Sequence, residues 1–111
     1  MFQVTVTLPV KRNGGYDNEV AIKAIEQEIA KSYGGFTHQN VSGGWFDSDT
    51  GLFYADESTQ VYTFVETEEA VEALLKRAEV WALWLEQIEL LVTVSEVSPH
   101  FVKGVRRPIA A

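Results

Sequence analysis

Two kinds of hydrophobic periodicity alternate along this chain, and their order constrains the fold more than any other feature of the sequence. Apolar and polar residues alternate over residues 2–8, which predicts a half-buried strand. Asp17 then precedes a stretch in which Ile22, Ile25 and Ile29 recur at helical spacing. We therefore expect a helix capped by Asp17, with one apolar stripe facing the core.

The rest of the chain predicts a hairpin, a second helix and a closing strand. Residues 36–46 read as a second strand that returns through residues 52–55 after a polar turn. Residues 59–65 are rich in β-branched and aromatic side chains, which favour a strand. Thr67 is placed to cap a second helix, and residues 88–97 predict the last strand.

The order of these elements is β-α-β-β-α-β, which is the split-βαβ, ferredoxin-like arrangement. It predicts an α+β domain with a four-stranded antiparallel sheet in the order 4-1-3-2. Both crossovers should be right-handed, which places both helices on one face of the sheet. We expect a single domain over residues 1–102 and a C-terminal tail over residues 103–111.

The sheet face away from the helices is predicted to lack a cover within the chain. The alternation of the third strand can be assigned in two ways, because this face could carry either Val61, Thr63 and Val65 or Tyr62 and Phe64. In both cases the face is half apolar and rich in threonine, so we expect it to be buried against a second copy in a homodimer or higher homo-oligomer. The side chains first expected there are Thr5, Thr7, Thr37, Gln39, Val61, Thr63, Val65, Leu91 and Thr93.

A pair of glycines, Gly43 and Gly44, interrupts the second strand, where glycine is otherwise unfavourable. This pattern predicts a bulge or a sharp bend in the hairpin. Trp45 and Phe46 follow directly, and we expect these rings to contact a ligand or a partner chain where the hairpin leaves the sheet.

The run GGFT…GGW…TG…E…VYTFVE, followed by a helix and a valine-rich strand, resembles a widespread uncharacterised family of small proteins from bacteria, plasmids and phages. The resemblance covers roughly residues 30–95 and implies a ferredoxin-like fold with no established activity. Some members carry an arginine after the tryptophan, where this chain has Phe46. The matching residues are Gly35, Phe36, Thr37, Gly44, Trp45, Gly51 and Glu57.

Charge and composition narrow the classes of partner. Acidic residues outnumber basic ones 16 to 9, and the net charge of −7 argues against binding to nucleic acid or to anionic lipid. The chain has no cysteine, which excludes disulfides and thiolate metal sites. We expect no metal and no cofactor, since the turn DSDTG departs from the calcium-loop pattern. The N-terminus does not resemble a signal peptide, so a cytoplasmic location is expected.

Two functional hypotheses follow from these residues. The first is a small oligomeric binding or accessory protein, carried by a phage or mobile element, that binds a protein or a small metabolite. The second is a small isomerase or hydrolase on a dimeric scaffold, with its site between the open sheet face and the 43–57 hairpin. In that case His38 is the candidate base, assisted by Tyr54 or Glu57.

Overall fold

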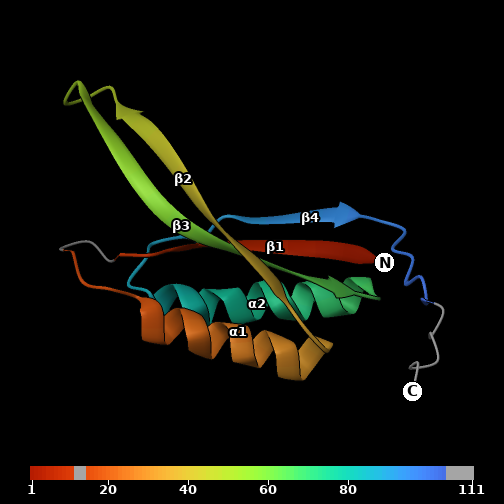
Figure 1. Cartoon of the computed structure of the whole chain (residues 1–111). Coiled ribbons are helices and arrows are strands. Elements are labelled where there is room, and N and C mark those ends of the chain that lie inside the picture. Colours follow the sequence, from red (N-terminus) through yellow and green to blue (C-terminus); the bar gives the residue numbers. More distant parts are fainter. Residues whose placement is uncertain (12–14, 105–111) are drawn as a thin grey trace, which may run out of the picture.

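The computed structural model describes residues 1–11 and 15–104, and it confirms the predicted fold class. The sheet order β2-β3-β1-β4 is the predicted order 4-1-3-2 seen from the other edge, and all neighbouring strands are antiparallel. Both helices lie side by side on one face of the sheet (Figure 1). The elements are β1 (Phe2–Pro9), α1 (Glu19–Tyr33), β2 (Thr37–Asp47), β3 (Leu52–Val65), α2 (Glu68–Trp84) and β4 (Val92–Glu96).

The core lies between the sheet and the two helices. Alternation in β1 buries Val4, Val6 and Leu8 against the helices, as the pattern predicts. The stripe of isoleucines on α1 meets them, and α2 adds Leu74 and Trp81, whose side chains are almost completely buried. The apolar stripes of the sequence therefore form one continuous core.

The structure resolves the ambiguity in the third strand. Val61, Thr63 and Val65 are buried on the helix side of β3, so our first expectation that Thr63 lies on the open face is wrong. Tyr62 and Phe64 lie on the open face instead, in edge-to-face contact. Burial of Thr63 is possible because its hydroxyl donates a 2.7 Å hydrogen bond to the carbonyl oxygen of Gly35.

As a result, the open face is more polar than the sequence suggested. Gln39 on β2 donates to Gln60 on β3 at 3.1 Å, and Gln60 donates to Thr7 on β1 at 3.4 Å. Thr5 pairs with Tyr62 and with Thr93 on the same face. These hydrogen bonds cross three strands, so most of this face is compatible with water and is not the apolar patch that we expected.

The ends of the elements follow the predicted caps with two differences. The Thr67 hydroxyl accepts from the backbone N–H of Ala70, as predicted. The end of α1 is marked by Gly34, which adopts the left-handed conformation. At the start of α1 the Asp17 carboxylate accepts from the N–H of Glu19 at 2.6 Å, but Asn18 occupies the N-cap position. The last strand begins at Val92, four residues later than predicted, because the chain leaving α2 first forms a turn in which the N–H of Gln87 donates to the carbonyl of Ala82.

An ion pair joins the two helices on their outer side. The Arg77 guanidinium of α2 donates to both carboxylate oxygens of Glu28 on α1, and the indole N–H of Trp81 donates to the same carboxylate at 3.2 Å. Arg77 also lies over the ring of Trp84, 5.1 Å from its centroid. Hydrogen bonds from Arg77 lower the pKa of Glu28 below its ordinary value, and burial opposes this shift only in part.

We predict that this carboxylate makes folding sensitive to acid. Because the folded pKa of Glu28 lies below its ordinary value of 4.5, the ionised group stabilises the fold above about pH 4.5. That contribution is lost as the pH falls through the folded pKa. Urea unfolding of the wild type and of Glu28→Gln should therefore show a gap in midpoint at pH 7 that narrows below pH 4.5.

The matched control is Glu72→Gln, which removes an exposed carboxylate on α2. Its midpoint should follow that of the wild type across the whole pH range. A gap between Glu28→Gln and the wild type that stays constant with pH would contradict the assigned role of Glu28.

Candidate functional site

The hairpin formed by β2 and β3 extends well beyond the sheet. Pairing of β3 with β1 stops where Pro9 meets Ser58, whereas pairing of β3 with β2 continues to Asp47 and Leu52. Residues 43–56 therefore form a two-stranded projection, here called the hairpin arm, that points away from the helices (Figure 1). In the part of the chain that the structure describes, the two strands of the arm pair only with each other.

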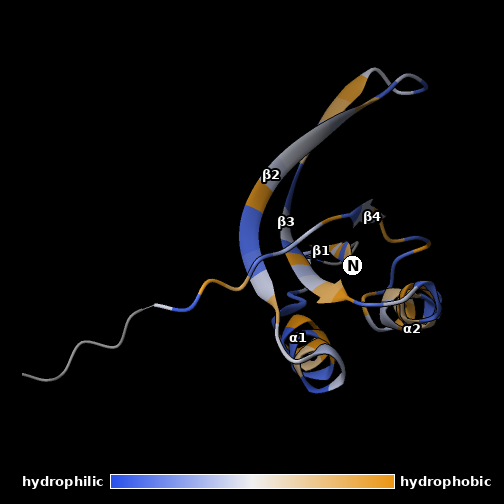
Figure 2. Ribbon diagram, turned by 90° about the vertical axis from the view of Figure 1, so that its right-hand side faces the viewer, coloured by the Kyte–Doolittle hydropathy of each residue, from blue (hydrophilic) through white to orange (hydrophobic). Residues whose placement is uncertain are grey.

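The hairpin arm is unusually apolar for an exposed ribbon. Trp45 stacks on Tyr54 across the strands, with ring centroids 4.7 Å apart and an interplanar angle of 17°. Phe46, Leu52 and Phe53 leave 62%, 54% and 72% of their surface in water. Figure 2 shows this apolar segment in the outer half of the hairpin, far from the helix-covered core. Such a surface is typical of a contact with another molecule.

Of the two features predicted at the paired glycines, a bulge or a sharp bend, the bulge is wrong. Strand pairing runs without a break from Ser42 opposite Glu57 to Trp45 opposite Tyr54. Gly44 is required for a different reason: a Cβ atom there would lie 2.8 Å and 2.9 Å from the ring of Phe53 and 3.2 Å from the carbonyl oxygen of Tyr54. At Gly43 a Cβ atom would meet nothing within 4 Å. The ring of Phe53 therefore lies close to Gly44.

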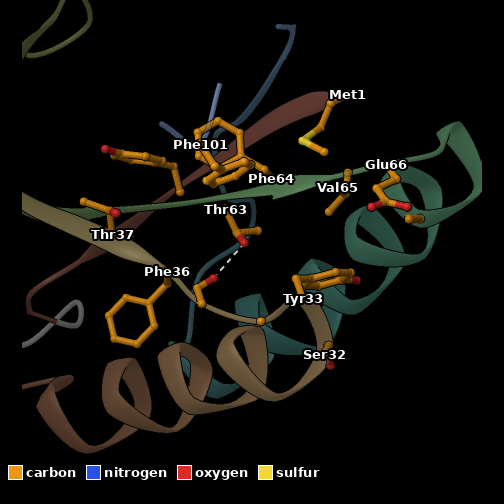
Figure 3. A pocket seen from close by; sticks show the side chains of 14 residues that line it. Met1, Ser32, Tyr33, Phe36, Thr37, Thr63, Phe64, Val65, Glu66 and Phe101 are labelled. Carbon is orange, nitrogen blue, oxygen red and sulfur yellow. Dashed lines mark hydrogen bonds between the residues drawn. The ribbon is translucent and has the colours of Figure 1, made fainter. Parts of the chain in front are cut away.

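An apolar cavity of about 620 Å³, here called the end cavity, lies at the opposite end of the β2–β3 ribbon. It wraps around the sheet: Figure 3 shows Phe64 and Phe101 on one side of the sheet, and Tyr33 and Phe36 on the helix side. Burial, and then the charge of Glu28, raises the pKa of the Tyr33 hydroxyl. The cavity is open to solvent and has an apolar lining that suits a hydrophobic side chain.

A second cavity, of about 550 Å³, lies between the first turns of α1 and the β2–β3 ribbon. We call it the dyad cavity because its wall contains a hydrogen-bonded pair, Nδ1 of His38 and Oε2 of Glu26. The Glu26 side chain is 8% exposed, whereas the His38 side chain is 54% exposed. The buried carboxylate thus holds an imidazole that is itself about half exposed.

This arrangement corrects the predicted site in two respects. His38 lies opposite buried Val61 on the helix side of the sheet, so it does not border the open face. Its carboxylate partner is Glu26 on α1, whereas Glu57 pairs with Ser42, about 13 Å further along the strand. Glu57 does line the same cavity.

The other predicted site residues are dispersed. Tyr54 lies out on the hairpin arm, about 23 Å along the ribbon from His38, so the proposed trio of His38, Glu57 and Tyr54 is not assembled in one place. Thr37 and Gln39 lie on the open face with Thr5, as predicted, whereas Thr63 belongs to the core.

Two general features are absent from the described residues. Among them, no group of three or more His, Cys, Asp or Glu residues is placed to hold a metal ion. None of the helices in residues 1–11 and 15–104 combines the length and the apolarity that crossing a membrane requires.

Comparison with known proteins shows the fold. No family model matches the chain, and no curated protein matches it by sequence. A phage SAM lyase solved in complex with S-methyl-5'-thioadenosine is similar, with a TM-score of 0.64 and 14% identity over 86% of this chain and 80% of that one. Pyrococcus horikoshii CutA is also similar, with a TM-score of 0.64 and 12% identity over 91% of this chain and 88% of that one. At such identities the likeness establishes the ferredoxin-like fold alone.

The packing of Phe53 over Gly44 leads to a prediction for the hairpin arm. Gly44→Val should lower the free energy of unfolding more than Gly43→Val does, because the new side chain displaces Phe53 and presses on the backbone at Tyr54. Gly43→Val should stay within about 0.5 kcal/mol of the wild type, since its side chain points into open space. Urea denaturation followed by circular dichroism measures both. An equal loss at the two positions would refute this packing.

Proposed function

We propose that this chain is a small homo-oligomeric binding protein whose subunits associate through the hairpin arm. The observation that carries the proposal is the exposed apolar surface of the arm. Burial of an aromatic side chain removes about 150–250 Å² from water. With their present exposure, the large side chains of the arm still offer on the order of 500 Å². That is more than half of the roughly 800 Å² that each partner contributes to a standard interface.

A second copy of this chain is the partner that fits best, because the chain also carries an apolar acceptor. The hairpin arm and the end cavity lie at opposite ends of the β2–β3 ribbon. β2 alone spans about 33 Å between Thr37 and Asp47, so an arm reaches the end cavity of a neighbour and not its own. Reciprocal exchange gives a dimer, and head-to-tail exchange gives a ring where the rotation between neighbours closes.

A small enzyme, an isomerase or a hydrolase, is the second candidate function. The observation that favours it is the pair of His38 and Glu26 in the dyad cavity. S-Methyl-5'-thioadenosine, the compound bound to the similar phage lyase, is a reasonable first ligand to titrate against the protein. A negative titration would leave the assembly proposal intact. A cytoplasmic location and carriage by a phage or mobile element remain predictions from the sequence.

Light scattering of the purified chain tests assembly. At micromolar concentration the wild type should have a mass of at least twice 12.4 kDa. The double variant Phe46→Ser/Leu52→Ser should shift the mass to that of a monomer with unchanged circular dichroism, because it removes two exposed apolar side chains and leaves Phe53 over Gly44.

The matched control is Val20→Ser, which changes a residue of α1 that is 84% exposed and lies outside the arm. It should assemble like the wild type. A wild type that is monomeric, or a double variant that assembles normally, would refute the proposal.

A further inference from the structure

We propose that His38, oriented by the buried Glu26, is a general base for a small uncharged ligand held in the dyad cavity. This inference goes beyond assembly, since it depends on α1 and the inner part of the β2–β3 ribbon and not on the hairpin arm. The proposed site consists of a buried carboxylate, a half-exposed imidazole and a polar cavity.

The burial of Glu26 is difficult to explain by stability alone. Glu26 follows Ile22 by four positions on α1 and lies against the core, where only 6% of the residue is exposed. Burying a carboxylate is costly unless it is paired, and an apolar residue of similar volume often stabilises such a position at least as well. The partner that compensates for this burial is His38. The pair therefore indicates a role that requires a charge beside the imidazole.

The contact between the two side chains determines how the imidazole is used. An ionised carboxylate only accepts hydrogen bonds, so the contact with Glu26 places a proton on Nδ1 of His38. The neutral ring then has its lone pair on Nε2, on the other edge of a side chain that is 54% exposed. A histidine base that is oriented by a carboxylate is an arrangement suited to proton transfer.

The walls of the dyad cavity indicate the class of ligand. Its volume of about 550 Å³ lies in the range typical of small-molecule sites. The inner wall has hydroxyl and amide groups, among them Thr59 and Asn40, which are joined by a 3.3 Å hydrogen bond. Carboxylates outnumber ammonium groups among the charged lining residues, and Lys23 is paired with Glu19 at 3.1 Å. The charged and titratable residues of the lining are Asp17, Glu19, Lys23, Glu26, His38 and Glu57.

This environment disfavours phosphates and carboxylates and favours an uncharged molecule that forms hydrogen bonds. In the proposed step, a proton moves from a water or ligand O–H group to Nε2 of His38. The electron pair of the broken O–H bond stays on the oxygen, which then attacks the ligand. For an ester, the attack breaks the acyl C–O bond and the alcohol leaves as its anion, which later regains the proton from the imidazolium.

Hydrolysis of p-nitrophenyl acetate by the full chain tests the proposal, because this uncharged ester reports base catalysis without knowledge of the natural ligand. We expect the protein-dependent rate to fall at least tenfold in His38→Ala, since general-base catalysis contributes about 10²–10⁴ in favourable sites. Glu26→Gln should retain the hydrogen bond to Nδ1 but lose the negative charge, so its rate should also fall. The wild-type rate should show a normal solvent deuterium isotope effect.

The control variant is His100→Ala, which removes the other histidine of the chain and should leave the rate unchanged. Nitrogen-15 NMR provides a readout that does not depend on the ester: neutral His38 should carry its proton on Nδ1 in the wild type. In Glu26→Leu the proton should move to Nε2. A wild-type rate equal to that of His38→Ala, an absent isotope effect, or a wild-type ring protonated on Nε2 would each overturn the proposal.

Discussion

The end of pairing between β1 and β3 is the constraint on which the rest of the structure depends. Pro9 lacks a backbone N–H and pairs with Ser58 as the last residue of that ladder. Up to this point β3 lies between β1 and β2 and is covered by helices. Beyond it, among the described strands, β3 pairs with β2 only. The same strand therefore supplies buried Val61 to the core and exposed Phe53 to the hairpin arm. The dyad cavity lies at this boundary, next to Ser58 and Glu57.

Much of the fold could be predicted from the sequence because two periodicities are strong. The isoleucines of α1 and the valines of β1 each have one apolar face, and the sheet order follows from the order of the elements. The faces of β3 could not be assigned, since Val61 and Tyr62 are both apolar enough for a core. Burial of Thr63 depends on the Gly35 carbonyl, a contact between distant segments that no local pattern reveals.

The candidate site was only partly accessible from the sequence. His38 was a reasonable candidate, but a glutamate on a helix is usually exposed, so Glu26 was missed. One signal existed: Glu26 lies four residues after Ile22 and one after Ile25, within the stripe that faces the core. The contact with His38 also required knowing that β2 packs against α1 with this residue on the helix side. Trp45 and Phe46 are exposed on the hairpin arm, and their contact with a ligand or partner stays a prediction, whereas the reason for Gly44 was missed.

The hairpin arm, whose two strands pair with each other, is expected to be less stable than the helix-covered part of the sheet. A two-stranded ribbon without a covering layer is at best marginally stable in water, so it opens locally without unfolding the domain. In the proposed oligomer, a neighbouring subunit that covers the arm would stabilise its paired form, so that the order of the arm would depend on protein concentration. Ser42 and Glu57 lie directly beside the arm and also line the dyad cavity. In the proposed oligomer, dissociation would therefore loosen the strands beside one wall of the cavity, while the helix that carries Glu26 would stay in place.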